Sequence, residues 1–262
     1  MLSDRPGASL RTIVAMGGGG FQMEPDNPVL DDHVIAIARE RSGRDHPRIC
    51  LIPTASRDDP ELIADFERLF APPRAEPRVL RLFDREDEDL AAVVREQEAV
   101  YVTGGNTANL LALWRLHGLD RILRDAWNAG VVMAGMSAGA ICWFESCTTD
   151  SFGPTLRPLH GGLGILAGSL SPHYHGEAQR RPTYRRLVAD GTLPAGYAVD
   201  DGVALVFRDL ELVDVVTSSP GAGAWRVTPD GAGGTTETAL PARVLGGSAP
   251  GGSGSSGVSP GG

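Results

Sequence analysis

The chain has 262 residues, 42% of them hydrophobic, and its 24 basic and 33 acidic residues leave a formal net charge of −9. This length and composition are sufficient for a well-buried core, in one large domain or two small ones. The excess of acidic residues argues against nucleic acid or an anionic membrane as the main partner.

Short apolar runs alternate with helical patterns over the first two-thirds of the chain. Continuous apolar strands separated by helices indicate a largely parallel sheet covered by helices on both faces. We therefore expect an α/β fold of the three-layer sandwich type. In chain order the pattern predicts a strand at residues 12–16, a helix at 28–41, a strand at 48–53, a helix at 59–70, a strand at 79–83, a helix at 87–98, a strand at 99–103, helices at 107–116 and 119–129, and a strand at 131–134.

The last third of the chain changes character. Short strands are expected at residues 204–207, 211–216 and 224–228, and the turns between them predict antiparallel hairpins that extend or flank the sheet. From residue 246 the chain is rich in glycine and serine with almost no apolar side chain, which predicts a disordered tail. We accordingly expect a single α/β domain over residues 1–245 and a tail over residues 246–262.

Cysteine usage and the N-terminus both indicate a reduced compartment. The three cysteines, Cys50, Cys142 and Cys147, are too few for a disulfide framework, and no further Cys or His pair completes a zinc pattern. The first residues lack the apolar core of a signal peptide. We therefore expect a cytoplasmic protein with no metal and no cofactor.

Three glycine-rich loops follow expected strands, at residues 17–20, 104–105 and 135–139. In open parallel sheets, sites form at the carboxyl ends of the strands, so the three loops are expected to face one crevice. The first loop lacks the ending of a P-loop and the dinucleotide fingerprint. We expect its backbone to approach a substrate or the third loop closely, with Gly18 and Gly19 as substrate-binding candidates.

The third loop reads GMSAG and fits the G-x-S-x-G pattern of a nucleophile at a tight strand-to-helix turn. Flanking glycines relieve Cβ clashes there, so Ser137 can point out of the sheet and the amide of Ala138 can face a developing oxyanion. The alternative is a glycine-rich turn with a helix-capping serine. The strand before the loop and the helical pattern after it favour the nucleophile.

The second loop continues into Asn106 and Thr107 and opens a helix, so its amides can point into the same crevice. It is the candidate for the second oxyanion donor, and Asn106 is a substrate-binding candidate. A plain N-capping loop, with Asn106 or Thr107 as the cap, is a compatible alternative.

A general base must come from the six histidines. His173 and His175 stand in a loop after the apolar residues 163–170, where a histidine is well positioned, and His160 precedes two glycines. The H-x-H spacing could alternatively bind a metal, although no further ligand cluster lies nearby in the sequence.

The third member of a triad would orient the imidazole through its other nitrogen. Asp200 and Asp201 precede an expected strand. Adjacent acids at such an entry are usually turn residues, but this turn can return to the crevice. Glu177 is the reserve candidate, and the residues alone leave the choice open.

Three motifs in this order resemble the peptidase E family: TGGNT at residues 103–107, GMSAGA at residues 135–140 and SPHYH at residues 171–175. The resemblance covers residues 11–227. It implies a serine peptidase with a fold similar to class I glutamine amidotransferases, and cyanophycinases are relatives of this family.

The resemblance implies Ser137 as the nucleophile, His173 as the general base, and the amides of Gly105 and Ala138 as the oxyanion donors. It places the third triad member at an acid–glycine turn, where peptidase E has glutamate and this chain has Asp201. Aspartate is one methylene shorter, so the histidine must lie closer or the backbone must shift.

Peptidase E proper cleaves dipeptides with an N-terminal aspartate, using an arginine shortly after the histidine loop. Counting directly from Gly176 and Glu177 places Gln179 at that position, whereas one inserted residue would place Arg180 there. Arg180 is therefore a substrate-binding candidate. We expect activity on several small peptides rather than on aspartyl dipeptides alone.

Hydrolysis of a small peptide through an acyl-enzyme is the leading hypothesis. A cyanophycinase-like hydrolase or an esterase could use the same residues. A different class of function is a non-catalytic protein that binds an anionic metabolite through the loops at 17–20 and 104–105. The sequence leaves the oligomeric state open, with a homodimer as one candidate.

Overall fold

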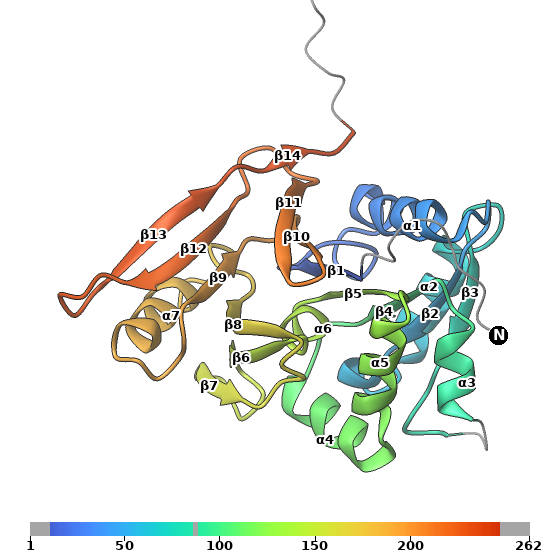
Figure 1. Cartoon of the computed structure of the whole chain (residues 1–262), viewed down its shortest axis with the longest axis horizontal. Helices are drawn as coiled ribbons and strands as arrows, with labels where there is room; N and C mark the ends of the chain where they lie inside the picture. Colours follow the sequence, from blue (N-terminus) through green and yellow to red (C-terminus); the bar gives the residue numbers. More distant parts are fainter. Residues whose placement is uncertain (1–10, 86–88, 247–262) are drawn as a thin grey trace, which may run out of the picture.

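The structure, a computed structural model, describes residues 11–85 and 89–246. Over these residues it contains an eight-stranded and a six-stranded β-sheet with helices packed around them (Figure 1). None of the helices in these two ranges is long and apolar enough to cross a membrane. The tail expected from residue 246 lies, apart from that residue, outside the described part of the chain.

The larger sheet contains, from edge to edge, β14 (Arg243–Val244), β11 (Glu211–Thr217), β10 (Val203–Arg208), β1 (Thr12–Met16), β5 (Val132–Met136), β4 (Ala99–Val102), β2 (Arg48–Ile52) and β3 (Glu76–Val79). The five strands from β1 to β3 are parallel to one another. On the other side of β1, β10 and β11 form an antiparallel extension. The largely parallel sheet predicted from the apolar runs is therefore confirmed.

Helices cover both faces of this sheet (Figure 1). Neighbouring residues of β1 point to opposite faces, so Ile13 lies in one hydrophobic core and Val14 in another. The first core includes apolar side chains of α3 (Leu90–Arg95), α4 (Thr107–His117) and α5 (Leu119–Asn128), and the second those of α1 (Val29–Ser42) and α2 (Pro60–Leu69). This arrangement is the predicted three-layer sandwich.

The smaller sheet contains β13 (Thr235–Leu240), β12 (Ala224–Pro229), β9 (Gly196–Val199), β8 (Leu166–Ser171), β6 (Phe144–Thr149) and β7 (Arg157–His160). Helix α7 (Arg180–Ala189) packs on it through Tyr184 and Leu187. The β12–β13 hairpin projects at one end of the molecule (Figure 1). The hairpin strands of the last third are thus divided, because β10 and β11 extend the larger sheet while β12 and β13 belong to the smaller one.

The third expected strand, residues 79–83, is displaced toward the N-terminus and forms β3. The amides of Leu82 and Phe83 donate to the carboxylate of Asp58, at 3.0 and 2.9 Å, instead of to a neighbouring strand. Composition cannot separate an apolar segment bound in this way from a strand. The expected helix at 87–98 is observed as α3, and its first two expected residues lie outside the described part.

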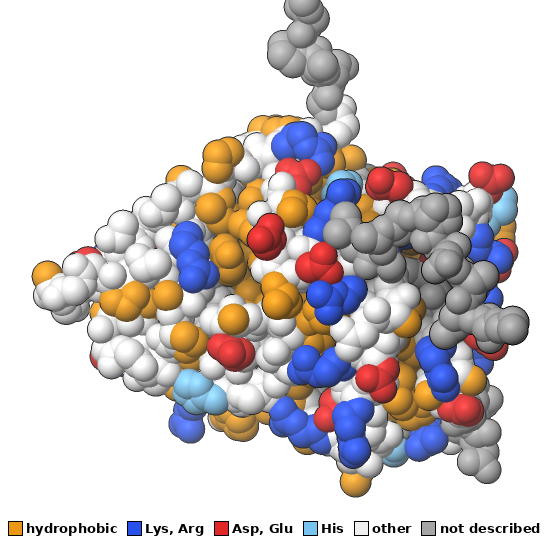
Figure 2. All heavy atoms as spheres, viewed as in Figure 1, with side chains coloured by type: hydrophobic (Ala, Val, Ile, Leu, Met, Phe, Trp, Pro, Cys, Tyr) orange, Lys and Arg blue, Asp and Glu red, His pale blue; other side chains and the backbone are white. Residues whose placement is uncertain are grey.

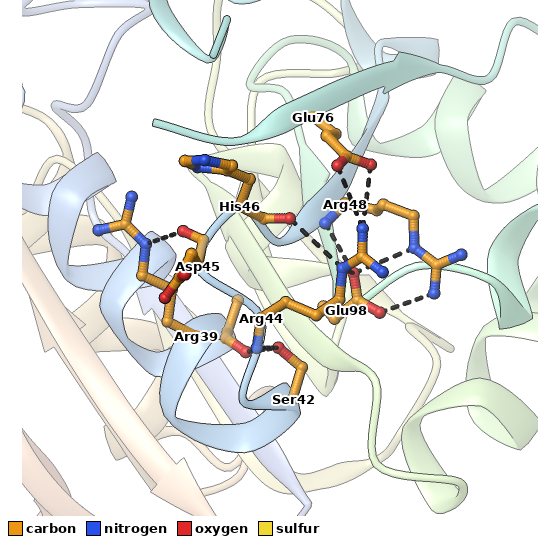
Figure 3. Close-up of polar contacts among 9 residues, drawn as sticks. Arg39, Ser42, Arg44, Asp45, His46, Arg48, Glu76 and Glu98 are labelled. Carbon is orange, nitrogen blue, oxygen red and sulfur yellow. Dashed lines mark hydrogen bonds and ion pairs between the residues drawn. The ribbon is translucent and has the colours of Figure 1, made fainter. Parts of the chain in front are cut away.

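The amino ends of the parallel strands are joined by ion pairs (Figure 3). Glu98, just before β4, accepts hydrogen bonds from the backbone amide and guanidinium of Arg48 at 2.7 and 2.8 Å, and Arg44 bonds to Glu76 at 3.1 Å. On the face seen in Figure 2, acidic and basic side chains both lie over the half of the molecule that contains the larger sheet.

The carboxyl ends of the same strands bring the three glycine-rich loops together. Strand β5 lies between β1 and β4, so the loops that follow these three strands are neighbours. Because β10 is antiparallel to β1, its first residue lies at the same edge, and the turn before it, with Asp200 and Asp201, joins the loops. Topology therefore brings segments that are far apart in the sequence together at this edge of the sheet.

Candidate active site

Ser137 lies at the sharp turn between β5 and the short helix α6 (Ala138–Ile141), with φ 50° and ψ −110°. A Cβ at Gly135 would lie 2.3 Å from the carbonyl oxygen of Gly139, and one at Gly139 would lie 2.2 Å from that of Val102, so the turn requires both glycines. A non-glycine residue at positive φ costs on the order of 1–3 kcal/mol and persists where the surroundings enforce it. The Ser137 side chain makes no capping bond to α6, which removes the support for the capping alternative.

The Ser137 hydroxyl is hydrogen-bonded to a histidine that is in turn bonded to an acid. Nε2 of His173 lies 2.8 Å from Ser137 Oγ, and its Nδ1 lies 2.5 Å from Oδ1 of Asp201. The three residues come from the turn after β5, the loop after β8 and the turn before β10. The imidazole is 12% exposed and the carboxylate 34%, so the ring is shielded while the acid contacts solvent.

His175 and Asp200 form a separate pair beside this set. Asp200 accepts from the backbone amide of His175 at 3.0 Å and from its Nδ1 at 2.9 Å, and its other oxygen accepts from the amide of Gly223 at 3.1 Å. The two adjacent aspartates therefore bind different histidines. Asp200 holds the loop that carries His173, while Asp201 contacts the His173 ring itself.

The glycine-rich loop after β1 packs against the same acid. A Cβ at Gly18 would lie 1.9 Å from Oδ1 of Asp201 and 3.0 Å from Cε1 of His173. A Cβ at Gly19, which has φ 96°, would lie 3.2 Å from the amide nitrogen of Gly202. The two substrate-binding candidates of this loop thus face protein groups, and the missing side chain of Gly18 gives Asp201 room to reach His173.

Two backbone amides beside the nucleophile have no acceptor among the described residues. A Cβ at Gly104 would lie 3.4 Å from the Cβ of Ser137, which places this loop next to the serine. Gly105 is exposed, with φ 135°, and a Cβ there would lie 2.2 Å from the carbonyl oxygen of Ala55. Within the described ranges, the amides of Gly105 and Ala138 donate to no protein group.

The other two substrate-binding candidates are engaged by the protein. Asn106 caps α4 through Oδ1, which accepts from the amide of Asn109 at 2.9 Å, and its Nδ2 donates to the carbonyl of Ser151 at 3.0 Å. Arg180 is only 3% exposed, and its Nε donates to Glu177 at 2.7 Å. Asn106 therefore is the N-cap of α4, as in the alternative interpretation of this loop as an N-capping loop. Glu177 pairs with Arg180 instead of with a histidine.

Two of the buried thiols, those of Cys142 and Cys147, are poor alternative nucleophiles. Burial raises the pKa of Cys147 to about 12 and the pKa of Cys142 well above its usual value. Only the thiolate is strongly nucleophilic, so both side chains stay protonated and inert at neutral pH. In the part of the chain that the structure describes, no group of three or more His, Cys, Asp or Glu side chains could hold a metal ion.

Sequence reasoning missed one side chain at this site. Gln22 accepts a hydrogen bond through Oε1 from the amide of Gly104 at 2.9 Å. It follows the glycine-rich loop at residues 17–20 closely in the chain, but no motif marks it. That proximity was its only signal in the sequence.

Comparison with known proteins identifies the family. The model of Peptidase family S51 matches residues 13–215. The uncharacterized peptidase YgaJ of Bacillus subtilis (strain 168) is 50% identical over 218 residues, which are 83% of this chain and 92% of that protein. A cyanophycinase of Geminocystis herdmanii (strain PCC 6308) is 29% identical over 182 residues, 64% of this chain and 65% of its own length.

The fold is similar to that of a peptidase from an acI-B1 Actinobacterium, whose crystal structure has a TM-score of 0.63 at 20% identity and covers 89% of this chain and 95% of its own. A peptidase E of Shewanella denitrificans (strain OS217 / ATCC BAA-1090 / DSM 15013) is 29% identical over 129 residues, which are 46% of this chain and 54% of that protein. The family match and the extent of the B. subtilis relative agree with the fold and with the three sequence motifs. The chain is therefore a member of peptidase family S51.

Proposed function

We propose that this chain is a serine hydrolase that cleaves small peptides through an acyl-enzyme. The observation that carries the proposal is the continuous set of hydrogen bonds from Ser137 through His173 to Asp201, at 2.8 and 2.5 Å. A serine, an imidazole and a carboxylate in this order form the arrangement that activates a serine hydroxyl on many unrelated folds.

In the proposed mechanism, Oγ of Ser137 attacks the scissile carbonyl carbon while its proton passes to Nε2 of His173. The carbonyl oxygen becomes negatively charged and accepts hydrogen bonds from the amides of Gly105 and Ala138. Asp201 stabilises the imidazolium and holds its tautomer. When the tetrahedral intermediate collapses, His173 protonates the departing amine.

Water completes the cycle. It attacks the ester on Ser137 while His173 accepts its proton, and the released serine takes that proton back. Aspartate, although shorter than glutamate, is compatible with orienting His173. Because Gly18 has no side chain, Oδ1 of Asp201 can approach Nδ1 of His173 to 2.5 Å. The glutamate of peptidase E is therefore not required by the geometry.

The substrate proposal rests on the state of Arg180, the arginine that shortly follows the histidine loop. Strict selection of an N-terminal aspartate requires an accessible cation, best supplied by a bidentate arginine. Arg180 is buried and bonded to Glu177 and to the carbonyl oxygen of Thr148. We therefore propose activity on several small peptides.

A cyanophycinase-like activity is the second candidate, favoured by the likeness to the Geminocystis cyanophycinase. An esterase would use the same residues. A non-catalytic role in binding an anionic metabolite has less support, because Gly18 and Gly19 pack against protein groups instead of lining an open cradle.

Hydrolysis of an equimolar mixture of X-Leu dipeptides, followed by mass spectrometry, tests the proposal. Ser137→Ala should reduce turnover by roughly 10⁴-fold or more with an unchanged melting temperature. The matched control is Ser146→Ala, because Ser146 is bonded to His160 at 3.0 Å in a second Ser–His contact, on the smaller sheet. Near-normal turnover of Ser137→Ala, or equal losses in both variants, would refute the assignment.

A further inference from the structure

The side chain of Gln22 occupies a fixed position at the edge of the candidate site. The residue before it, Phe21, is 2% exposed and packs against the rings of Phe66, Phe70 and Tyr101, with centroid separations of 5.6, 5.8 and 5.3 Å. This packing anchors the backbone from which Gln22 projects. Polar groups on such anchored segments are preorganised for binding.

The hydrogen bond to Gly104 determines which end of the Gln22 amide is which. A backbone N–H can only donate, so the atom 2.9 Å from the Gly104 nitrogen must be the oxygen, Oε1. The other end, Nε2, is consequently an N–H donor that points away from that contact. Across residues 11–85 and 89–246, Nε2 has no protein hydrogen-bond partner. It is also not a buried atom, so solvent or a ligand can reach it.

The position of this donor relates it to the nucleophile. Gly104 is the residue whose added Cβ would lie 3.4 Å from the Cβ of Ser137, and Gly105, next to it, presents a free amide. Because Gln22 occupies the Gly104 amide, the amide of this loop that stays unpaired among the described residues is that of Gly105, and Nε2 of Gln22 is a second unpaired donor, on the side chain that holds Gly104. A carboxamide at this place can bind an oxygen close to the scissile bond.

We propose that Gln22 is a substrate-binding residue whose Nε2 donates a hydrogen bond to a carbonyl or carboxylate oxygen of a peptide substrate, next to the scissile bond. This inference rests on the proposed peptide hydrolysis at Ser137. It assigns Gln22 two simultaneous contacts, since Oε1 holds the Gly104–Gly105 loop while Nε2 binds the substrate.

Two variants separate these contacts. Gln22→Glu keeps an oxygen for the Gly104 amide and replaces the donor with a carboxylate, whereas Gln22→Met is similar in size and removes both. Each is measured in two assays: kcat/KM on the X-Leu dipeptide mixture, and the rate at which an alkyl fluorophosphonate labels Ser137. The fluorophosphonate requires the serine and the oxyanion amides but has no peptide oxygen for Gln22.

We expect both variants to lose about 10-fold or more in dipeptide kcat/KM beyond any loss in labelling rate, as for the removal of one hydrogen-bond partner. Parallel losses in the two assays would overturn the proposal, because they would reduce Gln22 to a support of the loop. Unchanged dipeptide hydrolysis would overturn it as well.

The wild type distinguishes this inference from the proposed function. Labelling of Ser137 without cleavage of any dipeptide refutes both the peptide substrate and its contact with Gln22, while leaving the nucleophile in place. No labelling of the wild type at all refutes the serine hydrolase itself.

Discussion

Two adjacent aspartates allow a paired test, because Asp201→Asn should mainly reduce activity and Asp200→Asn should mainly reduce stability. Asp201 is 34% exposed and binds Nδ1 of His173. Asparagine at this position can present its NH₂ to the ring and favour the wrong tautomer, so kcat should fall by up to ~10⁴-fold. The stability cost should be small, since a partly exposed carboxylate gains little from one hydrogen bond.

Asp200→Asn should instead mainly destabilise the fold. Asp200 is 8% exposed, and its two oxygens bind His175 on one side and the amide of Gly223 on the other. Asparagine keeps only one oxygen, so one N–H group faces another donor, at a cost of about 1–3 kcal/mol. Each kcal/mol corresponds to a loss of about 2–4 °C in melting temperature for a chain of this size.

The assay compares dipeptide turnover with thermal unfolding for both variants at the same pH. We expect a large loss of kcat with a nearly unchanged melting temperature for Asp201→Asn. For Asp200→Asn we expect a lower melting temperature with a much smaller loss of kcat. The reverse ranking of kcat would exchange the two roles and contradict the assignment of Asp201 to His173.

Three further changes give distinct outcomes. Gly18→Ala should lower kcat by about 100-fold or more, because the added Cβ would lie 1.9 Å from Oδ1 of Asp201 and force the carboxylate away from His173. Unchanged kinetics would show that this position of Asp201 is not needed for catalysis. Burial raises the pKa of Asp31 to about 6, because the effect of burial is larger than the opposing effect of its hydrogen bonds. The folded state therefore favours the protonated acid, and the protein loses stability as the pH rises through about 6. Asp31→Asn should therefore raise the melting temperature at pH 8 more than at pH 4, and an equal shift at both pH values would contradict this. Glu98→Gln should weaken the three hydrogen bonds from Arg48 and lower the melting temperature with kcat/KM unchanged, whereas a selective loss of activity would connect the amino ends of the strands to the site.

Most of the larger sheet could be predicted because four of its parallel strands, β1, β5, β4 and β2, are buried on both faces along nearly all of their length, whereas the edge strand β3 is not. That burial produces continuous apolar runs such as those of β1 and β4, and the glycines at their carboxyl ends mark the loops. Most of the smaller sheet has no such signal. The buried hydroxyl of Thr148 in β6 donates a hydrogen bond to the buried hydroxyl of Ser171 in β8 at 2.8 Å, so polar residues occupy interior positions of this sheet. Only the pairing of distant strands makes these residues suitable for a sheet.

The candidate site shows the same division. The turn at Ser137 has a local cause, since Gly135 and Gly139 permit a close approach of the backbone, and its pattern is visible in the sequence. The pairing of His173 with Asp201 is not local, because the two residues are 28 positions apart and the neighbouring histidine and aspartate form an equivalent bond. From the residues alone that choice was open, and only the resemblance to peptidase E selected it.

Neither the local residue pattern nor the resemblance to peptidase E indicated Gln22. Its contact with the Gly104 amide bridges 82 positions and depends on the adjacency of the loops after β1 and β4. Likewise, Arg180 looked available in the sequence, but its exposed fraction of 3% and its bond to Glu177 are consequences of packing. Exposure and partner choice are tertiary properties, and a charged or polar residue in a motif does not reveal them.

The most direct test of the central claim is the site at which an alkyl fluorophosphonate forms a covalent bond. The purified protein is incubated with the probe, digested, and mapped by tandem mass spectrometry, with Ser137→Ala and Ser146→Ala treated in parallel. We expect one adduct, on Ser137, that is absent from Ser137→Ala and retained in Ser146→Ala. An unlabelled wild type, or an adduct that persists when Ser137 is replaced, would contradict the assignment of Ser137 as the nucleophile.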